Sequence, residues 1–113
     1  MNIAVDQLNP QTRCIRLSGR LDLKGSDEIA QRFTSLTATD RNHVIVDMRE
    51  VQFIASIGMR LLLSCAKAKS NRGGQLVLVG LQPSVREALE TAGIESLIRI
   101  YADEAVALTA LPE

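Results

Sequence analysis

The sequence predicts an α/β fold, and three observations lead to this prediction. Two short runs, the β-branched and mostly apolar 44–48 (VIVDM) and the apolar 76–79 (LVLV), have the composition of strands that are buried on both faces. Between them, residues 57–70 lack proline and are rich in Leu, Ala, Lys, Ser and Arg, which is typical of a helix of about four turns. Because a helical crossover joins the two strands, we expect them to be parallel and adjacent.

The length and composition of the chain indicate one domain. Its 113 residues are enough for one hydrophobic core but too few for two domains, and 46% hydrophobic with 23% charged residues excludes a disordered chain. The first residues lack the pattern of a signal peptide, and no stretch approaches the roughly 18 apolar residues of a membrane span. We therefore expect one cytoplasmic domain over residues 1–113, without membrane insertion.

The elements before the first buried run follow from alternation and turn residues. A short strand is expected at 3–8, a turn at Asn9-Pro10 and a second strand at 13–21. That strand alternates between an apolar face of Ile15, Leu17 and Leu21 and a polar face of Arg16, Ser18 and Arg20. Ser26 is placed to cap a helix that runs to about residue 36, and a loop follows it.

Glycine and proline mark the elements after the central helix. Gly73-Gly74 ends that helix, Pro83 starts another and Gly93 stops it. A short strand near 97–101 and a terminal helix at 103–111 complete the chain. The expected architecture is an α/β sandwich, with helices packed against a mixed β-sheet.

Ser56 lies at the joint between the 44–48 strand and the central helix. Its simplest role is structural, as a cap that accepts a hydrogen bond from an amide of the first turn. At roughly 100° per residue, it also shares a polar stripe with Arg60, Ser64 and Lys67. The opposite side is expected to be buried and comprises Ile57, Leu61, Leu62, Cys65 and Ala68.

Two large apolar residues break this polar stripe. Leu63 falls inside it and Met59 at its edge, so both are expected to be exposed near Ser56, as in a docking surface. A phosphate also suits this position, because a helix N-terminus offers unpaired N–H groups and Arg60 lies one turn away. Phosphorylation of Ser56 would therefore leave the fold intact and change the charge of the surface.

Four motifs resemble the STAS domain family, in particular the bacterial anti-sigma factor antagonists. The run FIASIGMRLLL (53–63) is similar to the family signature, in which a loop with Ser or Thr and then Gly joins a strand to a helix. GRLD (19–22), VIVDM and QLVLVGLQPSVREALETAGI (75–94) resemble further family motifs. The resemblance extends in register from about residue 3 to residue 108 and implies a STAS-like sandwich.

The resemblance also implies a function. In this family a partner kinase phosphorylates the loop serine, and the matching residue here is Ser56. The implied partners are an anti-sigma factor serine kinase, to which ATP and magnesium belong, and a serine phosphatase. The chain itself is then a regulator that needs no cofactor and is not an enzyme. The expected partner-binding residues are Asp22, Met59, Arg60, Leu63, Ser64 and Lys67.

One position departs from the family pattern. Ala55 stands where Asp or Ser usually precedes the phosphorylated residue. An alternative function therefore stays open, in which the chain is a STAS adaptor that binds a transporter ATPase or another scaffold partner without phosphorylation control. Under the adaptor hypothesis Ser56→Glu leaves binding unchanged, whereas under the antagonist hypothesis it abolishes binding.

Asp22 and Asp47 are expected at the same edge of the sheet as Ser56. The resemblance places both near the phosphorylation site, where they would orient the serine or help the nucleotide of the partner. The alternative role for each is that of a cap or turn acceptor. The sequence leaves both roles open.

The residue counts and motifs disfavour a zinc site, a hydrolase triad, a nucleotide-binding loop and a disulfide. His43, the only histidine, has no cysteine pair near it and is expected at the surface or half-buried at a strand edge. A hydrolase triad of Ser56, His43 and Asp47 lacks the G-x-S-x-G turn, and no glycine-rich phosphate loop is present. Cys14 and Cys65 are expected to be buried thiols rather than a disulfide.

The composition also disfavours nucleic acid as a partner. Thirteen basic residues balance thirteen acidic ones, so the chain has no electrostatic footprint for phosphates. Only Phe33, Phe53 and Tyr101 are aromatic, which leaves no platform for base stacking. We therefore expect protein partners only.

Overall fold

Five strands form one sheet in the computed structural model of the chain, which describes residues 1–112. Their spatial order follows their order in the sequence: β1 (Asn2–Asn9), β2 (Thr12–Leu21), β3 (His43–Ile54), β4 (Leu76–Val79) and β5 (Ile100–Tyr101). β1 and β2 are antiparallel, and the pairs from β2 to β5 are parallel. The predicted mixed sheet is confirmed, including the parallel pairing of β3 with β4.

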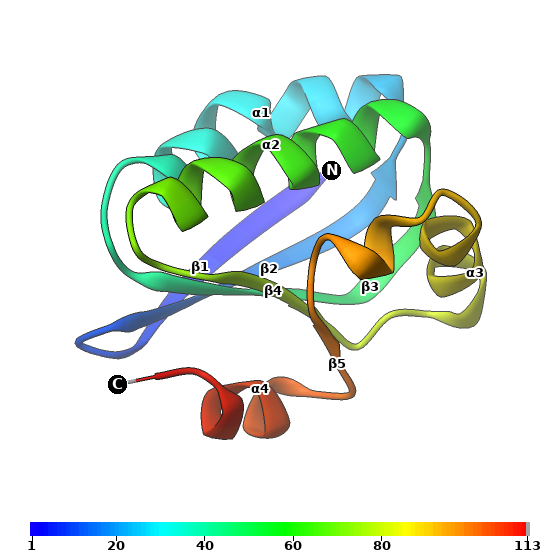
Figure 1. Cartoon of the computed structure of the whole chain (residues 1–113). Helices are drawn as coiled ribbons and strands as arrows, with labels where there is room; N and C mark the ends of the chain where they lie inside the picture. The colour runs from blue at the N-terminus through cyan, green and yellow to red at the C-terminus, as the bar shows by residue number, and fades with distance from the viewer. Residues whose placement is uncertain (113) are drawn as a thin grey trace.

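Helices cover both faces of this sheet (Figure 1). α1 (Leu23–Ala38) and α2 (Ser56–Asn71) lie side by side on one face, and α4 (Glu104–Ala110) lies on the other. α3 (Pro83–Thr91) contacts β3, and the 3₁₀ helix Ile94–Ser96 follows it. Within residues 1–112, no helix has both the length and the apolar composition needed to span a membrane.

Each face of the sheet has its own apolar core. The larger core lies under α1 and α2 and includes the fully buried Phe33 and Leu62. The smaller one lies under α4 and includes Ile45. Cys65 belongs to the larger core and Cys14 to the smaller, so the two free thiols lie on opposite faces of the sheet. The prediction of two buried thiols is confirmed.

Several element boundaries differ from the prediction. The strand expected at 44–48 continues to Ile54, because its second half pairs with the end of β2. α1 begins at Leu23 rather than near Ser26, because Asp22 occupies the capping position instead. Ser26 therefore lies inside the first turn, where it is buried and caps nothing. Of the strand expected at 97–101, only Ile100 and Tyr101 pair with β4 and form a strand. The domain was predicted to extend to Glu113, which lies outside the described residues.

The buried face of α2 is rotated from the predicted one. Four residues of this helix are buried: Gly58, Leu62, Cys65 and Lys69. Ile57 was expected inside but is 39% exposed, because it lies at the start of the helix and faces away from the sheet. Lys69 was not expected inside, yet it is fully buried with its Nζ hydrogen-bonded to Asp40.

Candidate functional site

Ser56 lies where the carboxyl ends of β2 and β3 meet the starts of two helices. Leu21 and Ile54 are paired at the ends of these strands, and the Ala55 N–H donates to the Leu21 carbonyl oxygen at 2.9 Å. Both helices then leave from this end of the sheet and run in the same direction (Figure 1). The exposed residues that follow these strand ends, Leu23 at the start of α1 and Ser56 at the start of α2, therefore lie at the same end of the sheet; this end is called the Ser56 patch.

Two glycines allow the helix starts to approach β2 this closely. A Cβ on Gly58 would lie 2.9 Å from the Leu21 carbonyl oxygen, and a Cβ on Gly25 would lie 1.8 Å from the Arg20 carbonyl oxygen. Both glycines are buried, and neither has a positive φ. They are therefore required by the close approach of α1 and α2 to the end of β2, and not by backbone conformation.

Asp22 is the cap of α1. Its Oδ1 accepts a hydrogen bond from the Gly25 N–H at 2.8 Å, and its Oδ2 lies 3.5 Å from Arg20 Nε. The Gly25 N–H, followed by the side chain of Arg20, lowers the pKa of this carboxyl group. Of the two roles left open by the sequence, the capping role is confirmed, and the exposed Leu23 follows this cap as the first residue of α1.

Ser56 itself is exposed at the first residue of α2. The capping position belongs to Ala55, which has no side chain to cap with, so the prediction that Ser56 caps the helix is wrong. The first hydrogen bond within the helix runs from Met59 N–H to the Ala55 carbonyl oxygen at 3.1 Å. The amides of residues 56–58 precede that bond and are available to an anion at this helix start.

The apolar surface around Ser56 is not the predicted one. Met59 and Leu63 are half-buried and pack against the larger core, so the prediction that both are exposed is wrong. The exposed apolar side chains at the two helix starts are instead Leu23 (69%) and Ile57 (39%), and Phe53 (39%) is exposed near the end of β3, on the opposite face of the strand from Ile54. The rotated helix explains the difference, because turning Ile57 outward turns Met59 and Leu63 towards the sheet.

Charged groups complete this patch. The guanidinium of Arg20 lies over the ring of Phe53, 4.4 Å from its centroid. Arg60, Ser64 and Lys67 are exposed along α2, as the polar stripe predicts. Arg20, Leu23 and Phe53 were not among the predicted site residues. Leu23 could have been predicted from the sequence, because an apolar residue directly after a capping Asp lies in the exposed first turn of a helix.

The exposed ridge of α2 separates two grooves. On one flank, α1 and α2 enclose a groove of about 270 Å³ lined by Ser26, Asp27, Ala30, Ile57, Arg60, Leu61 and Ser64. The buried Ser26 Oγ in this lining has no hydrogen-bond partner within residues 1–112. On the other flank, Leu63 and Lys67 line a separate groove. Of the predicted partner-binding residues, Arg60 and Ser64 line the first groove, Leu63 and Lys67 line the second, and Asp22 and Met59 line neither.

Asp47 and His43 lie away from Ser56. Asp47 is buried in the middle of β3, where Arg49 Nη2 donates to its Oδ2 at 2.8 Å. Burial by itself would raise the pKa of Asp47, but the hydrogen bonds from Arg49 and the charge of Arg16 outweigh burial and lower that pKa. The expectation that Asp47 lies at the edge near Ser56 is wrong, because β3 runs on for seven residues beyond Asp47 to Ile54.

His43 is the first residue of β3, at the end of the strand opposite to Ser56. It is buried rather than at the surface, and its Nδ1 accepts a hydrogen bond from the Gln75 N–H at 3.0 Å. Burial, with the nearby charge of Lys69, lowers its pKa. Ser56, His43 and Asp47 are thus not brought together, and residues 1–112 contain no cluster of side chains suited to a metal ion.

Comparisons with known proteins identify the family to which this fold belongs. The sequence profile of the STAS domain family matches residues 4–107, so the chain belongs to the STAS domain family. Among relatives, an anti-sigma F factor antagonist of Paenibacillus polymyxa is 29% identical over 98 residues, covering 86% of this chain and 84% of that protein.

Solved structures share the fold. An anti-sigma factor antagonist from Mycobacterium paratuberculosis superposes with a TM-score of 0.87 at 20% identity, covering 99% of this chain and 94% of that one. The anti-sigma factor antagonist SpoIIAA in its unphosphorylated form gives 0.76 at 19% identity, over 99% and 100% of the two chains. The Bacillus cell fate determinant SpoIIAA in the phosphorylated form gives 0.68 at 21% identity, over 96% and 97%.

Proposed function

We propose that this chain is a cytoplasmic anti-sigma factor antagonist that binds a serine-kinase anti-sigma factor while Ser56 is unmodified and releases it once Ser56 carries a phosphate. The observation that carries the proposal is the exposed Ser56 at the start of α2, where the chain also exposes Ile57 and where the hydrogen bond from Ala55 to Leu21 brings in the start of α1 with its exposed Leu23. Two relatives named as antagonists, and the existence of SpoIIAA in unphosphorylated and phosphorylated forms, support it.

The proposed modification is a phosphoryl transfer to this hydroxyl. Ser56 Oγ forms a bond to the γ-phosphorus of ATP held by the partner, the bond from that phosphorus to the β-γ bridging oxygen breaks, ADP leaves, and the hydroxyl proton passes to a base of the partner or to water. ATP and magnesium belong to the kinase. A serine phosphatase then hydrolyses the Oγ–phosphorus bond and returns the unmodified protein.

Release follows from the surroundings of the phosphate. A phosphoserine adds nearly two negative charges, and here they would lie next to the exposed Ile57 at the end of the sheet where α1 also begins with the exposed Leu23. A partner that packs on those side chains would have to bury this charge, which is unfavourable unless it is paired. Because about 1.4 kcal/mol changes affinity tenfold, a few kcal/mol of such desolvation is enough for release.

The test compares three baits in lysate of the native host: wild type, Ser56→Glu and Ser84→Glu. Ser84 is the matched control, because it is also an exposed serine in the first turn of a helix, α3. Wild type and Ser84→Glu are expected to retain a small ATP-binding serine kinase, identified by mass spectrometry, and Ser56→Glu is expected to lose it. With purified kinase and ATP, phosphate is expected on wild type but not on Ser56→Ala.

A different capture pattern would favour the adaptor function. If wild type and Ser56→Glu retain the same transporter ATPase or scaffold protein, the chain binds its partner without phosphorylation control. The antagonist proposal would then be rejected. The adaptor function is the alternative to test, because Ala55 stands where the family pattern has Asp or Ser before the phosphorylated residue.

A further inference from the structure

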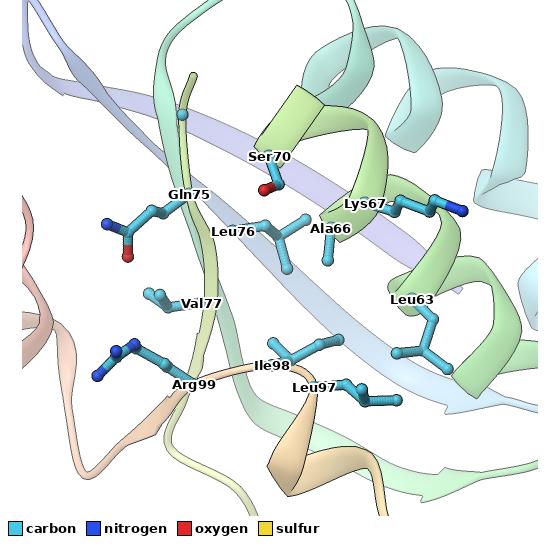
Figure 2. A pocket seen from close by; sticks show the side chains of 11 residues that line it. Leu63, Ala66, Lys67, Ser70, Gln75, Leu76, Val77, Leu97, Ile98 and Arg99 are labelled. Atoms are coloured by element: carbon cyan, nitrogen blue, oxygen red, sulfur yellow. The ribbon is translucent and has the colours of Figure 1, made fainter. Parts of the chain in front are cut away.

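The second groove beside α2 has a volume of about 550 Å³, about twice that of the groove between α1 and α2. It lies between α2 on one side and β4 with residues 97–99 on the other (Figure 2). Its surface is mainly aliphatic and includes Leu63, Ala66, Leu76, Leu97 and Ile98. The groove is separate from the patch around Ser56, which lies at the other end of α2.

Aliphatic side chains line the walls of this groove and could bury an apolar group of a partner. Figure 2 shows the side chains of Leu63 and Ala66 on α2 facing those of Leu76 and Ile98 across the groove. Leu76 and Ile98 are buried and form its floor, whereas Leu97 at its rim is 68% exposed. An exposed leucine beside an apolar hollow is the pattern of an interaction site.

The edge of β4 is open at this groove. Val44 lies opposite Leu76 in the sheet, and the Val44 N–H donates to the Gln75 carbonyl oxygen at 2.8 Å. Leu76 therefore directs its own N–H and C=O away from β3, towards the β5 side. There the pairing of β4 with β5 comprises only Leu78 and Val79, so in the described chain no strand pairs with Leu76 on that side.

The charges at this edge are all positive. No acidic side chain lines the groove, and its two cationic residues, Lys67 and Arg99, form no salt bridge within residues 1–112. In Figure 2, Arg99 extends to the opposite side of the strand edge from Leu76 and Ile98. A strand placed along this edge would therefore direct alternate side chains into the apolar groove and towards Arg99.

We propose that this groove binds an extended segment of a partner protein in which aliphatic and acidic residues alternate. The main chain of that segment pairs with β4 at Leu76, its aliphatic side chains enter the groove, and its carboxylates meet Arg99. Main-chain pairing provides affinity, and the alternating side chains provide specificity. This second surface goes beyond the proposed function and does not rest on it, because it involves neither Ser56 nor phosphate.

The test uses a short capped peptide of alternating glutamate and leucine, titrated into the isotopically labelled full chain and followed by NMR. We expect saturable shifts of the Leu63 and Leu97 methyl groups and slower hydrogen exchange of the Leu76 amide. Arg99→Glu is expected to weaken binding at least about tenfold, as expected for a lost ion pair at a docking edge. Leu97→Ser is expected to weaken it by a similar factor.

Two control variants test whether the weaker peptide binding of Arg99→Glu and Leu97→Ser comes only from a change of net charge or of surface hydrophobicity. Lys24→Glu reverses an exposed cation on α1, and Val106→Ser removes a side chain that is 46% exposed on α4; both are expected to leave binding unchanged. Ser56→Glu is also expected to leave it unchanged. The proposal is overturned if the shifts do not saturate, if a lysine-leucine peptide binds equally well, or if the methyl groups respond without protection of the Leu76 amide.

Discussion

Ser56 occupies a position where a negative charge is favourable to the fold. As the first residue of α2, it lies beside amides that precede the first hydrogen bond of the helix, and the first turn contains no acidic residue. An anion there interacts with the positive end of the helix dipole. The fold therefore accepts the phosphate, and the proposed effect of phosphorylation is confined to the partner.

A substitution that adds charge at Ser56 tests this directly. Ser56→Asp is expected to raise the free energy of unfolding by about 0.3–1 kcal/mol at low salt. Ser70→Asp, near the other end of the same helix, is expected to lower it by a similar amount, because the C-terminal end of the dipole is negative. Urea unfolding followed by circular dichroism measures both. A loss of stability in Ser56→Asp would contradict the proposed tolerance of phosphate.

At the scale of one element, α2 separates residues that hold the fold from residues that face a partner. Leu62 is fully buried, whereas Ile57 is 39% exposed beside Ser56. We expect Leu62→Ala to lower the free energy of unfolding by about 2–5 kcal/mol, as for other buried leucines. Ile57→Ser is expected to change stability by less than about 1 kcal/mol and to weaken retention of the kinase in the capture experiment. Equal losses of stability in both variants would show that Ile57 belongs to the core.

The sequence predicts the order of these elements better than their ends. The continuous apolar runs identify the buried parts of β3 and β4, and Pro83 and Gly93 mark α3 because proline and glycine act through local backbone geometry. The length of β3 is not visible in its composition, because its second half includes exposed polar residues that are held by pairing with β2.

Only part of the candidate site could be predicted, because the rest depends on contacts between residues far apart in the sequence. Helical periodicity finds the exposed stripe of Arg60, Ser64 and Lys67, since these residues repeat along one helix. It cannot find Leu23 or Phe53, which reach the patch from other elements. It also misplaces Ile57, because the rotation of α2 is set by the contact of Gly58 with Leu21, a contact between residues far apart in the sequence.

At the scale of the whole molecule, a cluster of charges at the far end of α2 ties three elements together. Lys69 Nζ donates to the Asp40 carbonyl oxygen at 2.8 Å and to Asp40 Oδ1 at 3.0 Å. Arg13 of β2 donates to Asp40 Oδ2 at 2.9 Å and to the Leu36 carbonyl oxygen at 2.6 Å. The cluster joins α2 to β2 and to the loop after α1, and it leaves the buried Lys69 charge paired.

This cluster predicts how stability depends on pH. Burial alone would raise the pKa of Asp40, but hydrogen bonds from Lys69, Arg13 and the Asn42 amide outweigh burial and hold that pKa well below its ordinary value of 3.8. A carboxyl group with a lowered folded-state pKa stabilises the fold above its unfolded-state pKa, and this contribution is lost as the pH falls through the folded-state value. The stability difference between wild type and Asp40→Asn is therefore expected to be largest above about pH 4 and to shrink at lower pH.

Urea unfolding at a series of pH values from about 2 to about 7 measures this difference. Lys69→Met provides the control, because it removes one of the two cations that contact Asp40 and replaces it with an apolar side chain of similar length. In the Lys69→Met background, the effect of Asp40→Asn is expected to depend less on pH, since Arg13 alone then favours the ionised carboxylate. A difference between wild type and Asp40→Asn that stays constant with pH would mean that Asp40 acts through its neutral hydrogen bonds, and the ion cluster would then contribute nothing to acid stability.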